Sequence, residues 1–501
     1  MNLTPDEAVA LVQRLSAELA ARSNYAATFE NYYTGRHPLK FASPEFAKQF
    51  GALFERFSDN WCQVIVDAVA ERLTVVGFSL DGERELDDAT WDLWRGQSLD
   101  VDSNLAFVDT LVNGRSFGLA WDGPDGLEVT FEHPSQCIVA YGAGNRRRRV
   151  SALKVWMNEE GGQDATLYTD TEVWKYTRTG APLTYPTPYP GTADPAMLIT
   201  AANTSGWLPR DVASEPWPLP HTLGVVPMVE LQNRPRLGSG PVSEIANVIP
   251  LQDSINLLWS HLLTASDFAA FAQRIVTGAE VPQVPVYDST GVKVGTKDMN
   301  LEKLRADRVL WLENPDAKIS EWSAANLANY TGVIETAVQH LAAQTRTPPD
   351  YLLGSMTNVS GDALTAAERG LVSKVRERQE YFGDGLRELM RVAHIANGDI
   401  GAAEAIALGR VRWRDAQYRT EGEHVDALLK KQALGVPRDV LWEELGADQT
   451  EIDRWNTLAD EATVRGDLAV QSAFGIPTPA TIDPAGHPPE GEMPNEMPPA
   501  A

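Results

Sequence analysis

The sequence predicts a mixed α+β fold, mainly α, and three observations carry this prediction. Apolar residues recur at helical spacing over several long stretches. Between positions 115 and 179 the period changes to two, which is typical of strands. From Leu251 to Thr277 there is no proline or glycine over 27 residues. A helix of that length spans roughly 40 Å, and mean globular helices are about a third to half as long.

Composition limits the function classes. The chain has 501 residues, 43% of them hydrophobic, which is enough for about two to four domains with a sizeable core. Its formal net charge of −26 disfavours a tight, sequence-reading DNA binder, because such proteins need a basic surface. An acidic chain can still surround DNA without binding it tightly. No signal peptide and no apolar run long enough for a membrane span are visible. Cys62 and Cys137 are expected to be buried free thiols, which fits a reducing compartment.

The first third of the chain is expected to hold helices followed by strands. Helices are expected at residues 5–22, about 45–73 and 83–115. Thr4 and Glu7 form a capping-box pattern at the first of them. The second carries a core-facing apolar stripe of Val64, Ile65, Ala68, Val69 and Leu73. Strands separated by turn residues, which predict a small antiparallel sheet unit, are expected at Phe117–Trp121, Leu127–Phe131, Ile138–Tyr141, Ser151–Met157, Thr166–Tyr168 and Glu172–Thr177.

The remaining two thirds are expected to be organised around long helices. Residues 181–220 hold nine prolines, which predict an extended, irregular segment. A strand at Gly224–Leu231 leads to the long helix, where Pro250 predicts a kink or a restart. After Gly278 comes a strand-like, turn-rich stretch. Then follow, in order, a helix at about 324–344, a loop over 345–364, a helix at about 362–397, a strand at Gly409–Arg414, smaller helices over 420–466, and a disordered tail from Ile476 with eight prolines.

No motif of enzymatic chemistry is present. The segment GVKVGTK at 291–297 lacks the Gly-Lys pair of a phosphate-binding loop, and YGAGNRRRR is expected to form a hairpin turn. The sequence has no HExxH, no zinc spacing of Cys and His, and no Gly-x-Ser-x-Gly, so no catalytic residue, metal or cofactor is predicted. His133, His340 and His394 are expected to be satisfied or surface histidines.

Charge is distributed unevenly along the chain. The basic run is Arg146, Arg147, Arg148 and Arg149. It fits either a solvated hairpin flank or a salt-dependent contact with nucleic acid or an acidic partner. Residues 421–501 hold 16 acidic residues against 5 Lys or Arg. That excess fits either solubility or a face that repels DNA.

The order of these elements resembles that of the portal proteins of long-tailed bacteriophages, most like those of phages infecting actinobacteria. Four segments carry the resemblance, which covers roughly residues 25–465: DNWCQVIVDAVAERLTVVGF (59–78), HTLGVVPMVELQNRPRLGSGPVSEIANVIPLQDSIN (221–256), FAAFAQRIVTG (268–278) and TPPDYLLGSMTNVSGDALTAAERGL (347–371). They look like the family's N-terminal helix and strand, the entry to its stem helix, the exit from that helix, and its tunnel loop.

The resemblance implies a portal architecture with wing, two-helix stem, clip insertion, tunnel loop and helical crown. On this chain the parts would be an N-terminal helix (1–24), the wing (25–240), the stem helices (242–277 and 324–344), the clip (278–323), the tunnel loop (345–362), a long helix linking wing and crown (363–399), the crown (400–466) and a disordered tail (467–501). Two long helices flanking an insertion suit packing against copies of the same chain in a closing ring.

The resemblance also implies the function and partners. Family members form a ring, usually a dodecamer, at one capsid vertex of the virion, and they assemble in the host cytoplasm. The ring docks the terminase large subunit, contacts the major capsid or scaffolding protein, passes double-stranded DNA without sequence specificity, and later holds the head–tail adaptor. The family carries no catalytic residues. Open alternatives are another virion shell or adaptor protein and, less well supported, a DNA-packaging enzyme.

Two sets of candidate contact residues follow. The tip of the tunnel loop is expected to face DNA, although an ordinary polar loop tip has the same composition: Met356, Thr357 and Asn358. In and beside the expected clip, three cations are candidates for contact with DNA, motor or adaptor, with surface salt bridges as the alternative: Arg274, Lys293 and Lys297.

Overall fold

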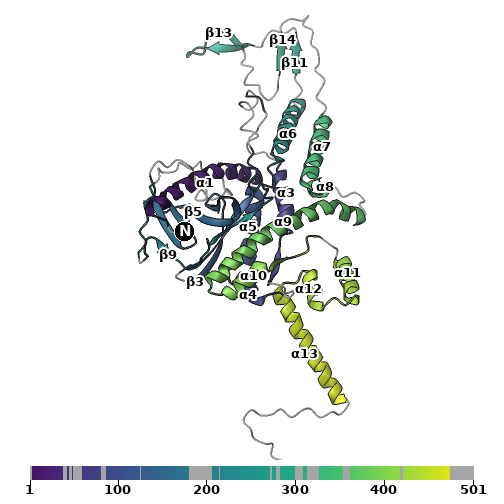
Figure 1. The fold of residues 1–501 in the computed structure, drawn as a ribbon. Coiled ribbons are helices and arrows are strands. Elements are labelled where there is room, and N and C mark those ends of the chain that lie inside the picture. Colours follow the sequence, from purple (N-terminus) through teal and green to yellow (C-terminus); the bar gives the residue numbers. More distant parts are fainter. Residues whose placement is uncertain are drawn as a thin grey trace, which may run out of the picture. The chain divides into compact units, whose positions relative to one another are not determined.

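The computed structural model confirms a mixed fold of helices and strands (Figure 1). It describes residues 3–37, 42–44, 48, 59–80, 86–123, 126–179, 206–213, 215–270, 274–277, 283–298, 309–312, 327–353, 361–417 and 421–473. The chain divides into two compact units, residues 1–424 and 425–501. Within the described residues, no helix is both long enough and apolar enough to cross a membrane.

The first helix, α1 (Pro5–Tyr33), begins with the predicted capping box between Thr4 and Glu7. It continues beyond residue 22, where the sequence predicted its end, because its buried stripe extends through Ser23 and Ala26 to Tyr32. Helix α3 (Trp61–Ala70) buries most of its predicted apolar stripe, with Val64 partly buried. The expected first half of that helix lies largely outside the described residues.

The predicted helix over 83–115 is instead two helices, α4 (Asp88–Gly96) and α5 (Leu99–Asn113). Ser98 separates them with a positive φ of 57°, a conformation that an uninterrupted helix cannot contain. Strand β1 (Val75–Ser79) precedes α4 and pairs antiparallel with β15 (Arg410–Trp413), far away in the sequence.

The predicted strands form two sheets rather than one. One sheet has the order β10-β2-β3, with bounds Met228–Gln232, Arg115–Gly123 and Gly126–Glu132. The other sheet has the strand order β4-β5-β6-β7-β8, and β9 also pairs with β7. The bounds of β4 to β9 are, in order, Cys137–Gly142, Asn145–Met157, Gln163–Tyr168, Glu172–Arg178, Leu208–Pro209 and Leu219–Pro220. The two-residue strands β8 and β9 lie in the proline-rich segment, of which 180–205 falls outside the described residues.

The layers follow from the alternation of side chains along these strands. Leu153 and Val155 of β5 pack against α1, whereas Ala152 faces the sheet of β2 and β10. The opposite face of that three-stranded sheet is covered by α5 and α9 (Gly361–Ala396). Two glycines permit this contact. A Cβ at Gly118 would lie 2.6 Å from a methyl of Leu389, and one at Gly385 would lie 3.2 Å from Cγ of Leu231.

The expected long helix is shorter than predicted. Helix α6 (Ile249–Ala270) has 22 residues, with Pro250 in its first turn, so the proline marks a start. Residues Arg274–Thr277, predicted as its last turn, form strand β11 instead and pair in parallel with β14 (Val309–Leu312). The β-branched residues Ile275 and Val276 before Gly278 favour this outcome.

Helix α7 (Leu327–Thr345) lies beside α6 (Figure 1). In the sequence between α6 and α7, β12 (Gln283–Tyr287) and β13 (Lys293–Asp298) form an antiparallel hairpin. After α7 come the short helix α8 (Pro349–Leu353), then α9, and then α10 (Ile400–Leu408). Residues 354–360 lie outside the described residues.

The C-terminal helices are α11 (Glu421–Ala433), α12 (Arg438–Leu445) and α13 (Gln449–Ala473). Trp442 of α12 and Trp455 of α13 meet edge to face with ring centroids 5.4 Å apart. Helix α13 continues through residues 467–473, which were predicted to belong to a disordered tail. The tail from Ile476 lies outside the described residues.

Candidate functional site

The base of the α6–α7 pair is held by buried charge. Glu244, in the turn before α6, accepts hydrogen bonds from the guanidinium of Arg378 at 3.0 and 3.2 Å. Its other carboxylate oxygen lies 3.5 Å from Nζ of Lys374. Burial alone would raise the pKa of Glu244, but Lys374 and Arg378 outweigh burial and lower it to about 2.

Lys374, which lies on α9, contacts both the turn before α6 and the last residue of α7. Its ammonium also donates a hydrogen bond of 2.7 Å to the carbonyl of Thr345, the last residue of α7. The lysine side chain is only 4% exposed, so solvent screens these contacts weakly. One buried cation therefore fixes the start of α6 and the end of α7 at the same place.

A second set of polar contacts fixes the first turns of α6. Tyr32 of α1 donates a 2.6 Å hydrogen bond to Asp253. Gln252 accepts one from the amide of Trp61 at 3.0 Å. Asn256 lies 2.7 Å from a ring nitrogen of His37. Sequence reasoning missed these residues, although the polar residues at 252 and 256, one helical turn apart and next to apolar positions 251 and 255, are a signal that it could have used.

The β12–β13 hairpin has the opposite character. Every side chain described from 283 to 297 is exposed. Successive residues point to opposite faces, so exposed Val286 and Tyr287 leave apolar groups on both faces. An isolated two-stranded hairpin is marginal in water. The exposed apolar side chains, with their exposed fractions, are Val284 (45%), Val286 (42%), Tyr287 (60%), Val292 (61%) and Val294 (63%).

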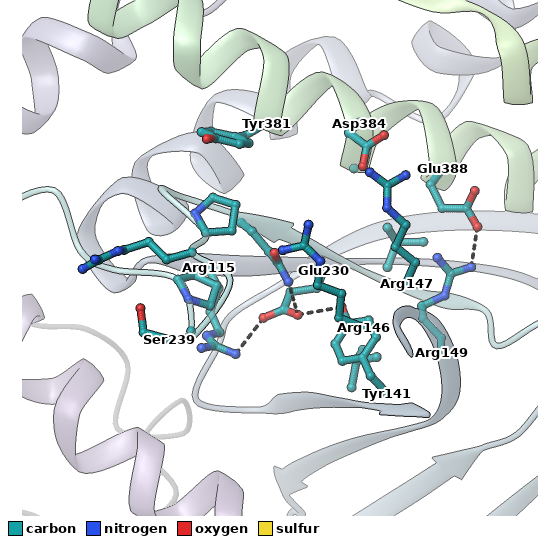
Figure 2. Close-up of a pocket in the computed structure, with 18 of the residues that line it drawn as sticks. Arg115, Tyr141, Arg146, Arg147, Arg149, Glu230, Ser239, Tyr381, Asp384 and Glu388 are labelled. Carbon is teal, nitrogen blue, oxygen red and sulfur yellow. Dashed lines mark hydrogen bonds and ion pairs between the residues drawn. The ribbon is translucent and has the colours of Figure 1, made fainter. Parts of the chain in front are cut away.

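A pocket of about 670 Å³ lies where β4, β5, β10, α9 and the loop 235–241 meet (Figure 2). Seven arginines and three carboxylates line it: Arg22, Arg115, Arg146, Arg147, Arg149, Arg236 and Arg387, with Glu230, Asp384 and Glu388. The predicted hairpin turn brings the basic run here, since Gly142 pairs with Asn145 and Gly144 takes a φ of 74° in the turn.

Part of this charge is already neutralised within the chain. Arg149 meets Glu388 at 2.6 Å, and Arg115 meets Glu230 at 2.7 Å, as the dashed lines of Figure 2 show. Glu230 also accepts a 2.7 Å hydrogen bond from the Tyr141 hydroxyl. Arg149 is therefore an ion-pair partner within its own chain, whereas Arg146 and Arg147 are exposed in the pocket lining, as a solvated hairpin flank would be. Contact of the basic run with nucleic acid or an acidic partner stays a prediction. Arg148 is exposed outside the lining.

A separate cluster joins α1, α5 and the turn after β3. Glu30, Asp109 and His133 each place one possible cation ligand within 4.8 Å of the others. His133 Nε2 lies 3.6 Å from a Glu30 oxygen. Burial raises the pKa of Asp109 to about 6. Burial lowers the pKa of His133, but Glu30 and Asp109 outweigh it and raise that pKa, so a protonated imidazole can balance the carboxylates.

Comparison with known proteins identifies the family. A sequence profile of the phage portal proteins of the SPP1 Gp6-like type matches residues 13–464. The chain belongs to this family. It is 28% identical over 483 residues to the portal protein of Mycobacterium phage L5, covering 91% of this chain and 90% of that protein. It is 28% identical over 420 residues to the portal protein of Mycobacterium phage D29, covering 79% of this chain and 78% of that protein. The resemblance predicted from the sequence is therefore confirmed.

Among the solved structures that this chain is similar to is a chain from the neck of an empty GTA particle computed with C6 symmetry. The identity is 14% and the TM-score 0.37, over 77% of this chain and 88% of that one.

Of the contact residues predicted for the tunnel loop and the clip, the structure describes the side chains of Lys293 and Lys297. Lys293 and Lys297 are exposed on β13. Arg274 begins β11, and its side chain is outside the description. Met356, Thr357 and Asn358 lie outside the described residues.

The histidine and cysteine predictions are confirmed. His394 lies 2.9 Å from the Thr90 hydroxyl and His340 is exposed. Cys62 and Cys137 are buried free thiols. The cluster around His133 was missed, because its three members are far apart in the sequence.

Proposed function

We propose that copies of this chain form a closed ring with a central channel at one vertex of a phage capsid, through which DNA is packaged and ejected. The observation that carries this proposal is the contrast within the helix pair. The lower ends of α6 and α7 are fixed by buried Glu244 and Lys374, whereas the hairpin inserted between these helices exposes apolar side chains on both faces. A neighbouring copy can cover those side chains in a ring.

The parts of the ring are assigned accordingly. The stem is α6 and α7, the clip is the insertion 278–323, and the wing is the two-sheet unit with its covering helices. The tunnel loop is 345–362 and the crown is 400–466. We assign the role of facing DNA to Met356, Thr357 and Asn358, and the role of contacting DNA or docking proteins to Arg274, Lys293 and Lys297.

The channel acts on DNA without sequence specificity. A net charge of −26 disfavours the many phosphate contacts that would hold DNA in place, so DNA can slide. The proposed partners are the terminase large subunit during packaging, the major capsid or scaffolding protein at the vertex, and the head–tail adaptor afterwards. The protein has a structural role with no catalytic residues. It assembles in the host cytoplasm and remains in the virion.

Negative-stain electron microscopy of the purified chain, with rotational analysis of end-on views and a parallel ATPase assay, tests this proposal. Rings with a central hole, about twelvefold symmetry and no ATP hydrolysis are expected. A chain that stays monomeric or dimeric at micromolar concentration would overturn the ring. If that species also hydrolyses ATP, the packaging-enzyme alternative takes its place.

A further inference from the structure

We propose that the arginine-lined pocket receives a carboxylate-rich segment of a neighbouring copy of this chain. The inference rests on the proposed function, since a ring is what brings two copies together. It assigns the pocket as a subunit–subunit binding site that recognises aspartate and glutamate side chains.

The first step is a local excess of positive charge. Besides Arg115 and Arg149, whose partners line the pocket, Arg387 pairs with Asp384 and Arg22 pairs with Glu18. Within the described part of the chain, the other three arginines of the lining make no ion pair and are exposed: Arg146, Arg147 and Arg236. Burial and the nearby charge of Arg115 lower the pKa of Arg22, which indicates a positive potential in this region. Three guanidinium groups are therefore available to an anionic partner.

The second step is the shape of the site. The arginines line a concave volume of about 670 Å³ rather than an extended strip. A DNA duplex offers phosphates on a convex surface and is bound by basic strips or by elements that enter its grooves. A pocket of this size suits a few side chains, and a guanidinium can bind a carboxylate through two parallel hydrogen bonds.

The third step is the apolar part of the lining. Tyr381 of α9 and Pro235 lie among the arginines. Leu237, in the same lining, is 88% exposed. Arginine beside aromatic and apolar groups is the composition of protein–protein interfaces. A polypeptide with carboxylates and an apolar neighbour for Leu237 therefore fits this site better than nucleic acid.

The fourth step identifies the partner as a second copy. Two chains of net charge −26 repel each other, so association needs local patches of opposite charge. The pocket supplies the positive patch. The chain also supplies negative segments, among them 421–501, where 16 acidic residues face 5 basic ones. A pocket on one copy and an acidic segment on the next form a heterologous contact, the kind that closes rings.

The test combines a photo-crosslink with charge reversal in the full-length protein. A photoreactive amino acid at position 237 reports what occupies the pocket in purified rings. The variant Arg146→Glu, Arg147→Glu, Arg236→Glu removes the available positive charge. Its matched control is Arg14→Glu, Arg36→Glu, Arg410→Glu, which makes the same change in net charge at exposed arginines outside the pocket lining.

The expected crosslink joins position 237 to an Asp- and Glu-containing peptide of a second copy. The pocket variant should weaken assembly about tenfold or more, while keeping the melting temperature of the isolated chain, and the control should assemble like the unaltered protein. A crosslink to DNA, to another protein or within one chain would overturn the inference, as would normal assembly of the pocket variant.

These outcomes are distinct from failure of the proposed function. If the unaltered chain forms no rings, the ring proposal fails, and the crosslink alone then decides about the pocket: a crosslinked dimer keeps the inference and its absence overturns it. If rings form and position 237 crosslinks to no neighbouring copy, only the pocket inference fails.

Discussion

The base of the α6–α7 pair and the β12–β13 hairpin inserted between these helices have opposite physical chemistry. At the base, Glu244 and Lys374 are 4% exposed and satisfied by their own chain. In the hairpin, Val294 and Tyr287 are 63% and 60% exposed. The comparison teaches that one chain satisfies the buried charges at the base and leaves the apolar side chains of the hairpin exposed, which is why we propose that a neighbouring copy adds stability at the hairpin.

The largest expected effect concerns the buried charges at the base. Glu244→Ala leaves Lys374 buried without a carboxylate and leaves Arg378 only its more exposed partner Glu377, and we expect it to lower the free energy of unfolding by about 3–5 kcal/mol. Glu18→Ala is the control, because its side chain is 46% exposed and pairs only at the surface. Denaturant titrations of both variants measure the difference, and equal effects would show that the base carries no special stability.

The next effect is a pH dependence. The pKa of Glu244 is lowered to about 2 in the folded protein, below its usual value of 4.5. Its stabilising contribution is therefore present above about pH 4.5 and is lost as the pH falls toward about 2, on the order of 3 kcal/mol. Glu244→Gln should flatten the stability curve across this window. If the unfolding free energies of the unaltered protein and of Glu244→Gln change with pH in parallel between about pH 2 and pH 4.5, the lowered pKa of Glu244 is contradicted.

A pair of glycine substitutions compares packing around the buried strand β2 with packing around the exposed hairpin strand β13. A Cβ at Gly118 would meet a buried methyl of Leu389 at 2.6 Å, whereas a Cβ at Gly295 in β13 would meet nothing within 4 Å. Gly118→Ala should cost about 1–3 kcal/mol of unfolding free energy through overpacking, and Gly295→Ala should cost much less. Leu389 is fully buried, so Leu389→Ala is destabilising by itself. It should cost less in the Gly118→Ala background than in the unaltered protein, which thermal melts of both single variants and the double variant check.

The smallest effect on the isolated chain is expected in the hairpin. The triple change Val284→Thr, Val286→Thr, Val294→Thr keeps the β-branched shape at exposed positions. It should alter the unfolding free energy of the monomer by only about 0.5 kcal/mol or less, yet reduce the ring fraction in native mass spectrometry. A large loss of monomer stability would show that the hairpin is already packed within its own chain.

The sequence predicted elements well where local pattern decides them. The capping box at Thr4, the alternating strands from 115 to 178 and the turn at Gly144 all depend on neighbours in the sequence. The helix break at Ser98 could not be predicted, because the apolar periodicity continues across it. The strand at Arg274–Thr277 depends on its partner β14, and a pairing between distant segments leaves only the weak local signal of Ile275 and Val276.

The candidate sites were less predictable for the same reason. The basic run was visible in the sequence, but its division into paired Arg149 and available Arg146 and Arg147 depends on Glu388, which lies more than 200 positions away. In the sequence, Lys374 and Glu368 are two of many charged residues in one helical stretch, and nothing distinguishes their roles. In the structure, Lys374 is buried against Glu244 and the last residue of α7, whereas Glu368 pairs with Arg72. Burial of a charge is decided by tertiary packing, which composition does not contain.

The most direct test is hydrogen–deuterium exchange, compared between the isolated chain and the ring separated by size exclusion. The account predicts that amides of residues 283–298 exchange rapidly in the isolated chain and become protected in the ring. It also predicts that amides at the start of α6 are protected in both states. Equal protection of the hairpin in both states, or an α6 start that is protected only in the ring, would contradict the claim that the base is completed by its own chain and the hairpin by a neighbour.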